Sequence, residues 1–250
     1  MTKNNRFKGL CAAAVMAVAG LGAQAQELEF SGYFNGLFPV AEFNNTVNVL
    51  PQGDFKPIDR TAIAQSASAG IGGSLRVGLW LDIGANHRLL PFAEASLFWN
   101  ATQSKVRDIY DNNALNQELK ATPRIPHYFN IPLQAGLKYR YYLTDIIRPF
   151  AEASIGVDVM FVSGNGYRNI SYNNIKNFHH YSYKPSGAMS WTVGLGSYLG
   201  SNVTAGIYYI DLGSHRMEYT SRSYKGDNSA SFTVEKRHIG EIAIRIGFHF

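Results

Sequence analysis

The sequence predicts an all-β fold, a transmembrane antiparallel up-and-down β-barrel of eight strands, with short turns at one end and long loops at the other. Three observations predict it. Apolar side chains recur at every second position over long segments, which is the period of a β-strand. The connections between these segments alternate between short and long. The segments also reach the roughly 9–11 residues that a tilted strand needs to cross a membrane.

Eight segments carry this alternation, at residues 27–38, 68–83, 89–100, 128–143, 149–163, 188–199, 203–212 and 237–250. Successive side chains of a strand point to opposite faces, so in-phase apolar residues share one face of the sheet. In chain order, these rows include Phe30 and Phe34, Leu75 and Val77, Ala95 and Leu97, Leu133 and Leu137, Ile155 and Val157, Met189 and Val193, Ala205 and Ile207, and Ile244 and Ile246.

The connections fall into two classes. Short turns occupy residues 84–88, 144–148 and 200–202, and long polar loops occupy 39–67, 101–127, 164–187 and 213–236. Strict alternation of short and long connections is typical of transmembrane barrels and not of soluble β-sandwiches. The first long loop leaves room for another hairpin around Glu42–Leu50, so ten strands is the alternative count.

The amino terminus has the layout of a secretory signal peptide. Lys3, Arg6 and Lys8 precede a short apolar run, and Ala23, Gln24 and Ala25 form a small-x-small cleavage site. The run is shorter than the roughly 20 apolar residues of a transmembrane helix. We therefore expect a signal peptide at residues 1–25 and one barrel domain at 26–250. The only cysteine lies within the signal peptide, so the mature chain would have no disulfide and no thiolate metal site.

The charge excludes one class of function. The formal net charge is +5, but three of the 23 basic residues belong to the signal peptide, which leaves 20 against 18 acidic residues and a net charge of +2. Nucleic-acid binding needs a concentrated basic patch, and the sequence has none. The mature chain also has no run of 18 apolar residues.

An internal repeat and the last strand of the sequence are similar to features of a known protein family. The sequence PFAEAS at 91–96 recurs at 149–154, and Gly-Leu pairs at 78, 136 and 194 have the same spacing of 58 residues. With the Ile-Pro-Leu of 131–133, the aromatic run of 139–142 and the alternating strand that ends at Phe250, these features resemble the small bacterial outer-membrane β-barrels, the OmpA-like and OmpX-like superfamily.

The resemblance implies export to the bacterial outer membrane, with short turns in the periplasm and long loops outside the cell. It also implies three kinds of contact: with outer-membrane lipid and lipopolysaccharide, with an extracellular ligand at the loops, and with the barrel-assembly machinery through the strand ending at Phe250. We expect a monomer and no nucleic-acid partner.

Charged residues alternate with the apolar rows and should therefore point into the lumen. An Arg or Lys on the lipid face near the midplane would cost about 2–4 kcal/mol, and buried charges need partners. The predicted ion-pair network comprises Arg76, Glu94, Lys138, Arg140, Glu152, Asp158 and Arg245, with Glu29, Asp82, Glu241 and His249 also facing inward. An eight-stranded barrel is just wide enough for its own side chains, and inward Trp80, Phe92 and Tyr142 narrow it further. A sealed lumen is therefore expected, and a small diffusion channel is the alternative.

One short motif could carry chemistry. His180 and Ser182 form a His-x-Ser pair like that of some lipid A deacylases, but the following residues depart from that pattern and no acid lies close downstream. A serine nucleophile needs a base and a group that orients the base. We expect no catalytic, cofactor-binding or metal site, and a lipid A-modifying enzyme is the third alternative. The adjacent His179 and His180 would point apart on an extended segment, which does not suit a metal ion.

The long loops are the best candidates for function, because loops on a rigid scaffold often carry binding. Tyrosines interleave there with basic residues, a composition that suits contact surfaces and anionic sugars or phosphates. It would equally suit anchoring at lipid head groups. The expected function is non-enzymatic, in envelope structure or in surface interaction and adhesion. The candidate contact residues are Tyr167, Arg168, Tyr172, Tyr181, Tyr183, Arg216 and Arg222.

Overall fold

A computed structural model describes residues 25–44, 67–104, 122–172, 175–223 and 230–250. Within these ranges, eight long strands form a closed antiparallel barrel. They are β1 (Ala25–Val40), β2 (Ala67–Gly84), β3 (His87–Thr102), β5 (His127–Tyr141), β6 (Ile147–Val162), β9 (Ser186–Leu199), β10 (Val203–Ser223) and β11 (Ala230–His249). The predicted fold class and the count of eight are confirmed, and each predicted segment falls within or beside one strand.

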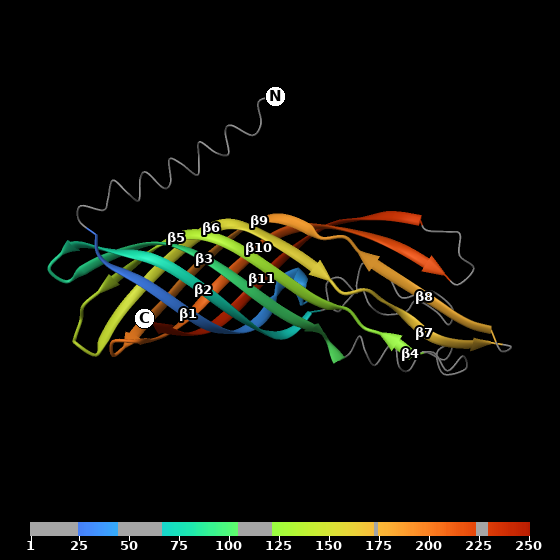
Figure 1. Cartoon of the computed structure of the whole chain (residues 1–250), viewed down its shortest axis with the longest axis horizontal. Coiled ribbons are helices and arrows are strands. Elements are labelled where there is room, and N and C mark those ends of the chain that lie inside the picture. The colour runs from blue at the N-terminus through green and yellow to red at the C-terminus, as the bar shows by residue number, and fades with distance from the viewer. Residues whose placement is uncertain (1–24, 45–66, 105–121, 173–174, 224–229) are drawn as a thin grey trace, which may run out of the picture.

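Each barrel strand pairs with its neighbours along the chain, and β11 pairs with β1 to close the sheet. The closing register runs from Ser31 opposite His249 to Val40 opposite Gly240. The ends of the described chain and the short turns lie at one end of the barrel, and the three smaller strands β4, β7 and β8 lie at the other (Figure 1). We call these the short-turn end and the long-loop end.

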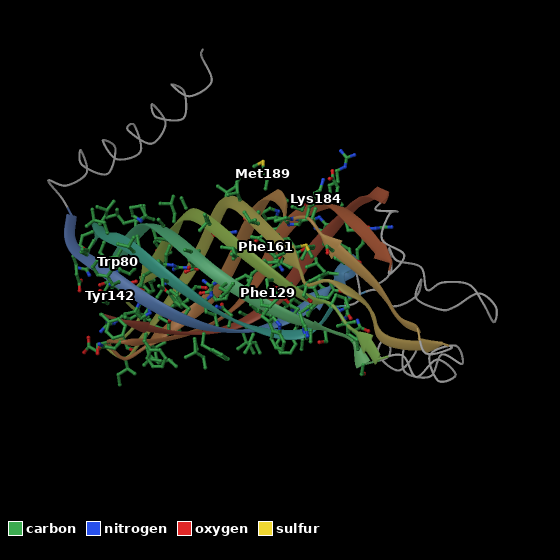
Figure 2. The ribbon with its side chains drawn as sticks, turned by 45° about the vertical axis from the view of Figure 1, so that its right-hand side comes forward. Trp80, Phe129, Tyr142, Phe161, Lys184 and Met189 are labelled. Atoms are coloured by element: carbon green, nitrogen blue, oxygen red, sulfur yellow. The ribbon has the colours of Figure 1, made fainter. Side chains whose placement is uncertain are left out.

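The outer wall of the barrel is apolar. Leu75, Leu195 and Ile207 are each more than 60% exposed, and each of the eight strands carries at least one exposed large apolar residue. Towards the long-loop end the wall carries aromatic pairs, among them Trp191 with Tyr209, at 5.3 Å between ring centroids. Phe129 and Phe161 pair across β5 and β6 and lie nearer that end than Trp80 and Tyr142 (Figure 2). An apolar band with aromatic girdles is what a lipid bilayer requires of a barrel.

Two of the three glycines spaced 58 residues apart show what the repeat does. A Cβ on Gly136 would lie 2.7 Å from the ring of Phe92, and one on Gly194 would lie 2.1 Å from the ring of Tyr208. Each glycine therefore admits an aromatic ring of the neighbouring strand into the lumen. The repeat thus serves packing inside the barrel, where any larger residue would displace that ring.

The structure corrects the third and fourth long loops. The segment expected as a loop at 164–187 contains a hairpin of β7 (Asn165–Tyr172) and β8 (Ile175–Tyr183), and β10 and β11 continue well beyond the expected ends of their strands. β8 pairs with β10, β7 pairs with β8, and β4 (Thr122–Arg124) pairs with β7. The expectation failed because polar strands outside the membrane lack an apolar face and so lack the alternation that marks a strand.

The first long loop begins with the short 3-10 helix η2 (Ala41–Phe43). The remainder of the proposed extra hairpin at Glu42–Leu50 lies outside the described residues, as do residues 1–24, so the signal peptide stays a prediction. Within the described part of the chain, no helix is long and apolar enough to span a membrane.

Candidate functional site

The centre of the lumen is an ion-pair cluster built around Arg76 of β2. Its guanidinium Nη2 lies 2.6 Å from Glu94 Oε2 and 2.6 Å from Glu152 Oε1. Glu94 is its cross-strand neighbour on β3, whereas Glu152 reaches it across the lumen from β6. All three side chains are at most 4% exposed. The two glutamates of the repeated PFAEAS sequence therefore bind the same arginine.

Two more cations complete this cluster. Arg245 of β11 lies 3.0 Å from Glu94 through Nη2, and Lys138 of β5 lies 3.2 Å from Glu152 through Nζ. Arg245 also donates to Asn35 Oδ1 at 2.7 Å, and Lys138 donates to the Tyr33 hydroxyl at 3.3 Å. Three cations thus face two carboxylates, and neutral oxygens and aromatic rings accept the remaining donors.

Aromatic rings close the lumen at the short-turn end. Trp80 donates through Nε1 to Glu29 Oε2 at 2.8 Å, and His249 Nδ1 lies 3.0 Å from Glu29 Oε1. Arg140 stacks over Trp80 at 3.7 Å from the ring centroid and donates to the Tyr142 hydroxyl at 2.6 Å. Within the described residues Arg140 therefore lies against aromatic partners and not against a carboxylate, unlike its place in the expected network.

In the long-loop half of the lumen, Asp158 of the expected network has a histidine partner that the strand alternation did not indicate. Asp158 of β6 lies 3.1 Å from His215 Nε2 on β10, and both side chains are fully buried. Above this pair, Phe43 of η2 packs edge-on against Tyr128 at 5.4 Å between centroids, within a cluster that also holds Leu212 and Ile239. Buried side chains thus line both halves of the lumen in the described part of the chain.

One residue expected inside the lumen is exposed instead. Asp82 lies near the end of β2 and is exposed, and it pairs there with Arg88. Asp82 is exposed because β2 extends past the lumen at the short-turn end, where both faces of the sheet meet solvent. Glu29, Glu241 and His249 are buried inside the barrel as the alternation predicts.

The candidate contact residues lie on the sheet that extends beyond the barrel. Tyr167, Arg168 and Tyr172 belong to β7, Tyr181 and Tyr183 to β8, and Arg216 and Arg222 to β10. The structure describes two of these side chains: Tyr183 is partly buried against the apolar cluster, and Arg216 is exposed. Lys184, just after β8, pairs with Glu218 of β10 at 3.0 Å. That contact holds the pKa of the Glu218 carboxyl below its usual value.

The His-x-Ser motif lies on β8, where Ser182 is opposite Thr220 of β10 and is exposed. The side chain of His180 is outside the described part of the structure. Among the described residues, no group of three or more His, Cys, Asp or Glu side chains is placed to hold a metal ion.

No family model matches the chain, and no curated protein matches it. Among solved structures, it is similar to a major outer membrane protein from Thermus thermophilus, with 11% identity, coverage of 90% of this chain and 100% of that one, and a TM-score of 0.48. It is also similar to OprG from Pseudomonas aeruginosa (10%, 91% and 97%, TM-score 0.42) and to Ail from Yersinia pestis (10%, 89% and 97%, TM-score 0.39). The fold of the chain is a closed, eight-stranded antiparallel β-barrel with an apolar outer wall.

Proposed function

We propose that the protein is an outer-membrane β-barrel with a sealed lumen, and that its binding surface is the sheet at the long-loop end. The observation that carries this proposal is the continuation of β10 and β11 beyond the barrel together with β8, β7 and β4 (Figure 1). A barrel wall extended in this way holds its surface residues on paired strands, and rigid display favours binding.

The composition of this sheet supports contact with anionic groups. Its strands carry the tyrosines and arginines named above, and tyrosine and arginine are enriched at the centres of interfaces. Sulfated or phosphorylated sugars, including those of lipopolysaccharide, would meet both the positive charge and the aromatic faces. As further expected partners, the surrounding lipid contacts the apolar wall and the assembly machinery recognises β11, and we propose a monomer.

Removal of the β7–β8 hairpin tests the binding surface. Replacing residues 165–183 by a short Gly-Ser turn should leave the barrel folded, because the ion-pair cluster lies in other strands. The refolded full-length protein should be retained on immobilised heparin, as an accessible sulfated sugar, and should elute with salt. The variant should elute at lower salt, and neither protein should bind neutral dextran. Equal retention of both proteins would contradict the assignment of the surface to this hairpin.

The sealed lumen predicts the absence of steady conductance. In a planar lipid bilayer, the refolded mature chain should give no stable single-channel steps, because Arg76 and its two glutamates fill the centre and Phe43 with Tyr128 cover the long-loop end. Heat-modifiable migration on a gel would first show that the inserted protein is folded. Large and steady steps in a folded sample would establish the diffusion channel instead.

A further inference from the structure

Three side chains on the outer wall have the relative placement of a serine, its base and the group that orients the base. His238 of β11 is the cross-strand neighbour of Ser214 on β10. Its Nδ1 lies 3.5 Å from Ser214 Oγ, and its Nε2 lies 3.1 Å from Asp211 Oδ2. An ionised carboxylate only accepts hydrogen bonds, so Asp211 fixes the proton on Nε2 and leaves Nδ1 free to accept the serine proton.

A β-bulge brings these side chains together. Residues three apart in a regular strand point to opposite faces, but the pairing of β10 with β11 shifts between Asp211 and Gly213. Gly213 has a φ of +83°, and a Cβ there would lie 2.1 Å from the carbonyl oxygen of Met189. Asp211 Oδ1 accepts a hydrogen bond from the Gly213 amide at 2.8 Å. Bulges of this kind often redirect a side chain beside an active site.

The three side chains differ in exposure in the way that a nucleophilic site requires, from an exposed serine to a shielded carboxylate. Ser214 is exposed, the His238 side chain is 38% exposed, and the Asp211 side chain is 9% exposed. The orienting carboxylate is therefore shielded and the nucleophile is accessible. Gly187, on the neighbouring strand, adds no side chain to the wall, and a Cβ there would meet only a backbone oxygen at 3.9 Å.

The position of this site between the apolar wall and the long-loop end indicates its substrate. Asp211 lies opposite Trp191 of the aromatic girdle, and Met189, which is 69% exposed, belongs to the apolar wall. Lys184 lies further toward the long-loop end than Met189 (Figure 2), and Arg216 is exposed two residues beyond Ser214. Acyl chains would contact the wall on the short-turn side of the site, and anionic head groups would meet Arg216 on its long-loop side. The ester linkage of a lipid lies between these two regions.

We propose that Asp211, His238 and Ser214 form a catalytic site that hydrolyses acyl esters of the surrounding anionic lipids. Ser214 Oγ attacks the ester carbonyl carbon while its proton passes to His238 Nδ1. The tetrahedral intermediate breaks the bond to the alcohol oxygen, which takes the proton from His238 and leaves. Water, deprotonated by His238, then attacks acyl-Ser214, releases the fatty acid and restores the serine. Asp211 acts as a positioning residue. The substrate class rests on the membrane location proposed above.

Covalent labelling tests the nucleophile without any lipid. An alkyl fluorophosphonate should form a phosphorus–oxygen bond to Ser214 with release of fluoride, and mass spectrometry of the folded protein should find the adduct on the peptide that contains Ser214. If His238 only neutralises Asp211, the folded protein will not be labelled at Ser214, and the proposal is overturned. Because this readout needs no membrane, it separates failure of the site from failure of the membrane assignment.

Lipid turnover tests the activity. Vesicles that contain the full chain, lipopolysaccharide and the anionic phospholipid phosphatidylglycerol should release fatty acid, and the shortened lipid found by mass spectrometry identifies which of the two lipids is cleaved. Ser214→Ala should abolish release, and Asp211→Asn should lower kcat roughly 10²–10⁴-fold with little change in KM and slow the labelling of Ser214. The matched control is Ser201→Ala, an exposed serine of the short turn between β9 and β10 that should change neither readout. Release that persists in Ser214→Ala, or that is lost in Ser201→Ala, overturns the proposal.

Discussion

Replacing Glu152 by alanine should lower the free energy of unfolding by about 3–5 kcal/mol, the cost of leaving a buried charge without its partner. Glu152 accepts bonds from Arg76 at 2.6 Å and 2.8 Å and lies 3.2 Å from Lys138. Without it, three buried cations would face the single carboxylate of Glu94. Urea unfolding of the refolded barrel in lipid vesicles, followed by tryptophan fluorescence, measures this change.

The matched control is Glu27→Ala. Glu27 also pairs with an arginine, Arg88, at 3.0 Å, but its side chain is 62% exposed. An exposed ion pair contributes about 0–1 kcal/mol, so this variant should unfold close to the parent. Equal effects of the two substitutions would mean that the central cluster is open to water and that the lumen is not sealed.

The second large effect is expected on the outer wall. Leu195→Arg should destabilise the folded barrel by about 2–4 kcal/mol, because an arginine near the bilayer midplane must leave water. Leu195 lies in the middle of the apolar row of β9, between Trp191 of the girdle and Leu199 at the short-turn end. The unfolding measurement in vesicles applies here as well.

Ile146→Arg is the control for this prediction. Ile146 has the same exposed fraction as Leu195, 68%, but it lies in the short turn after β5. An arginine there reaches the lipid head groups, so it should destabilise the barrel by only about 0–1 kcal/mol. Comparison of the two variants thus distinguishes the effect of depth in the membrane on stability from the effect of side-chain exposure. Similar destabilisation by both would contradict the position assigned to the membrane, and no effect of either would contradict membrane insertion of this wall.

The pairing inside the lumen could be predicted only in part. Arg76 with Glu94, and Lys138 with Glu152, are neighbours across adjacent strands, so alternation and hairpin register are enough to place them together. The contact between Arg76 and Glu152 joins residues 76 apart in sequence. It depends on the diameter and shear of the closed barrel, which no local pattern encodes. The same holds for Asp158 with His215.

Alternation also fails where the strand itself is irregular. The bulge at Gly213 shifts the phase of β10, so that Asp211 and Ser214 both approach His238. A strict period of two would have placed Asp211 and Ser214 on opposite faces, and neither residue stands out in the sequence. A glycine in a strand can mark a bulge, but most glycines of this chain do not.

The sequence by itself predicted the fold class, eight strands as the favoured count, and the inward face of the charged residues that alternate with the apolar rows, because the bilayer demands one apolar face with a period of two. The tertiary structure alone decided which charges meet across the lumen, that the polar segment after β6 forms a hairpin paired with β10, and that three residues gather at the bulge. The geometry of these contacts is set by barrel closure and strand register.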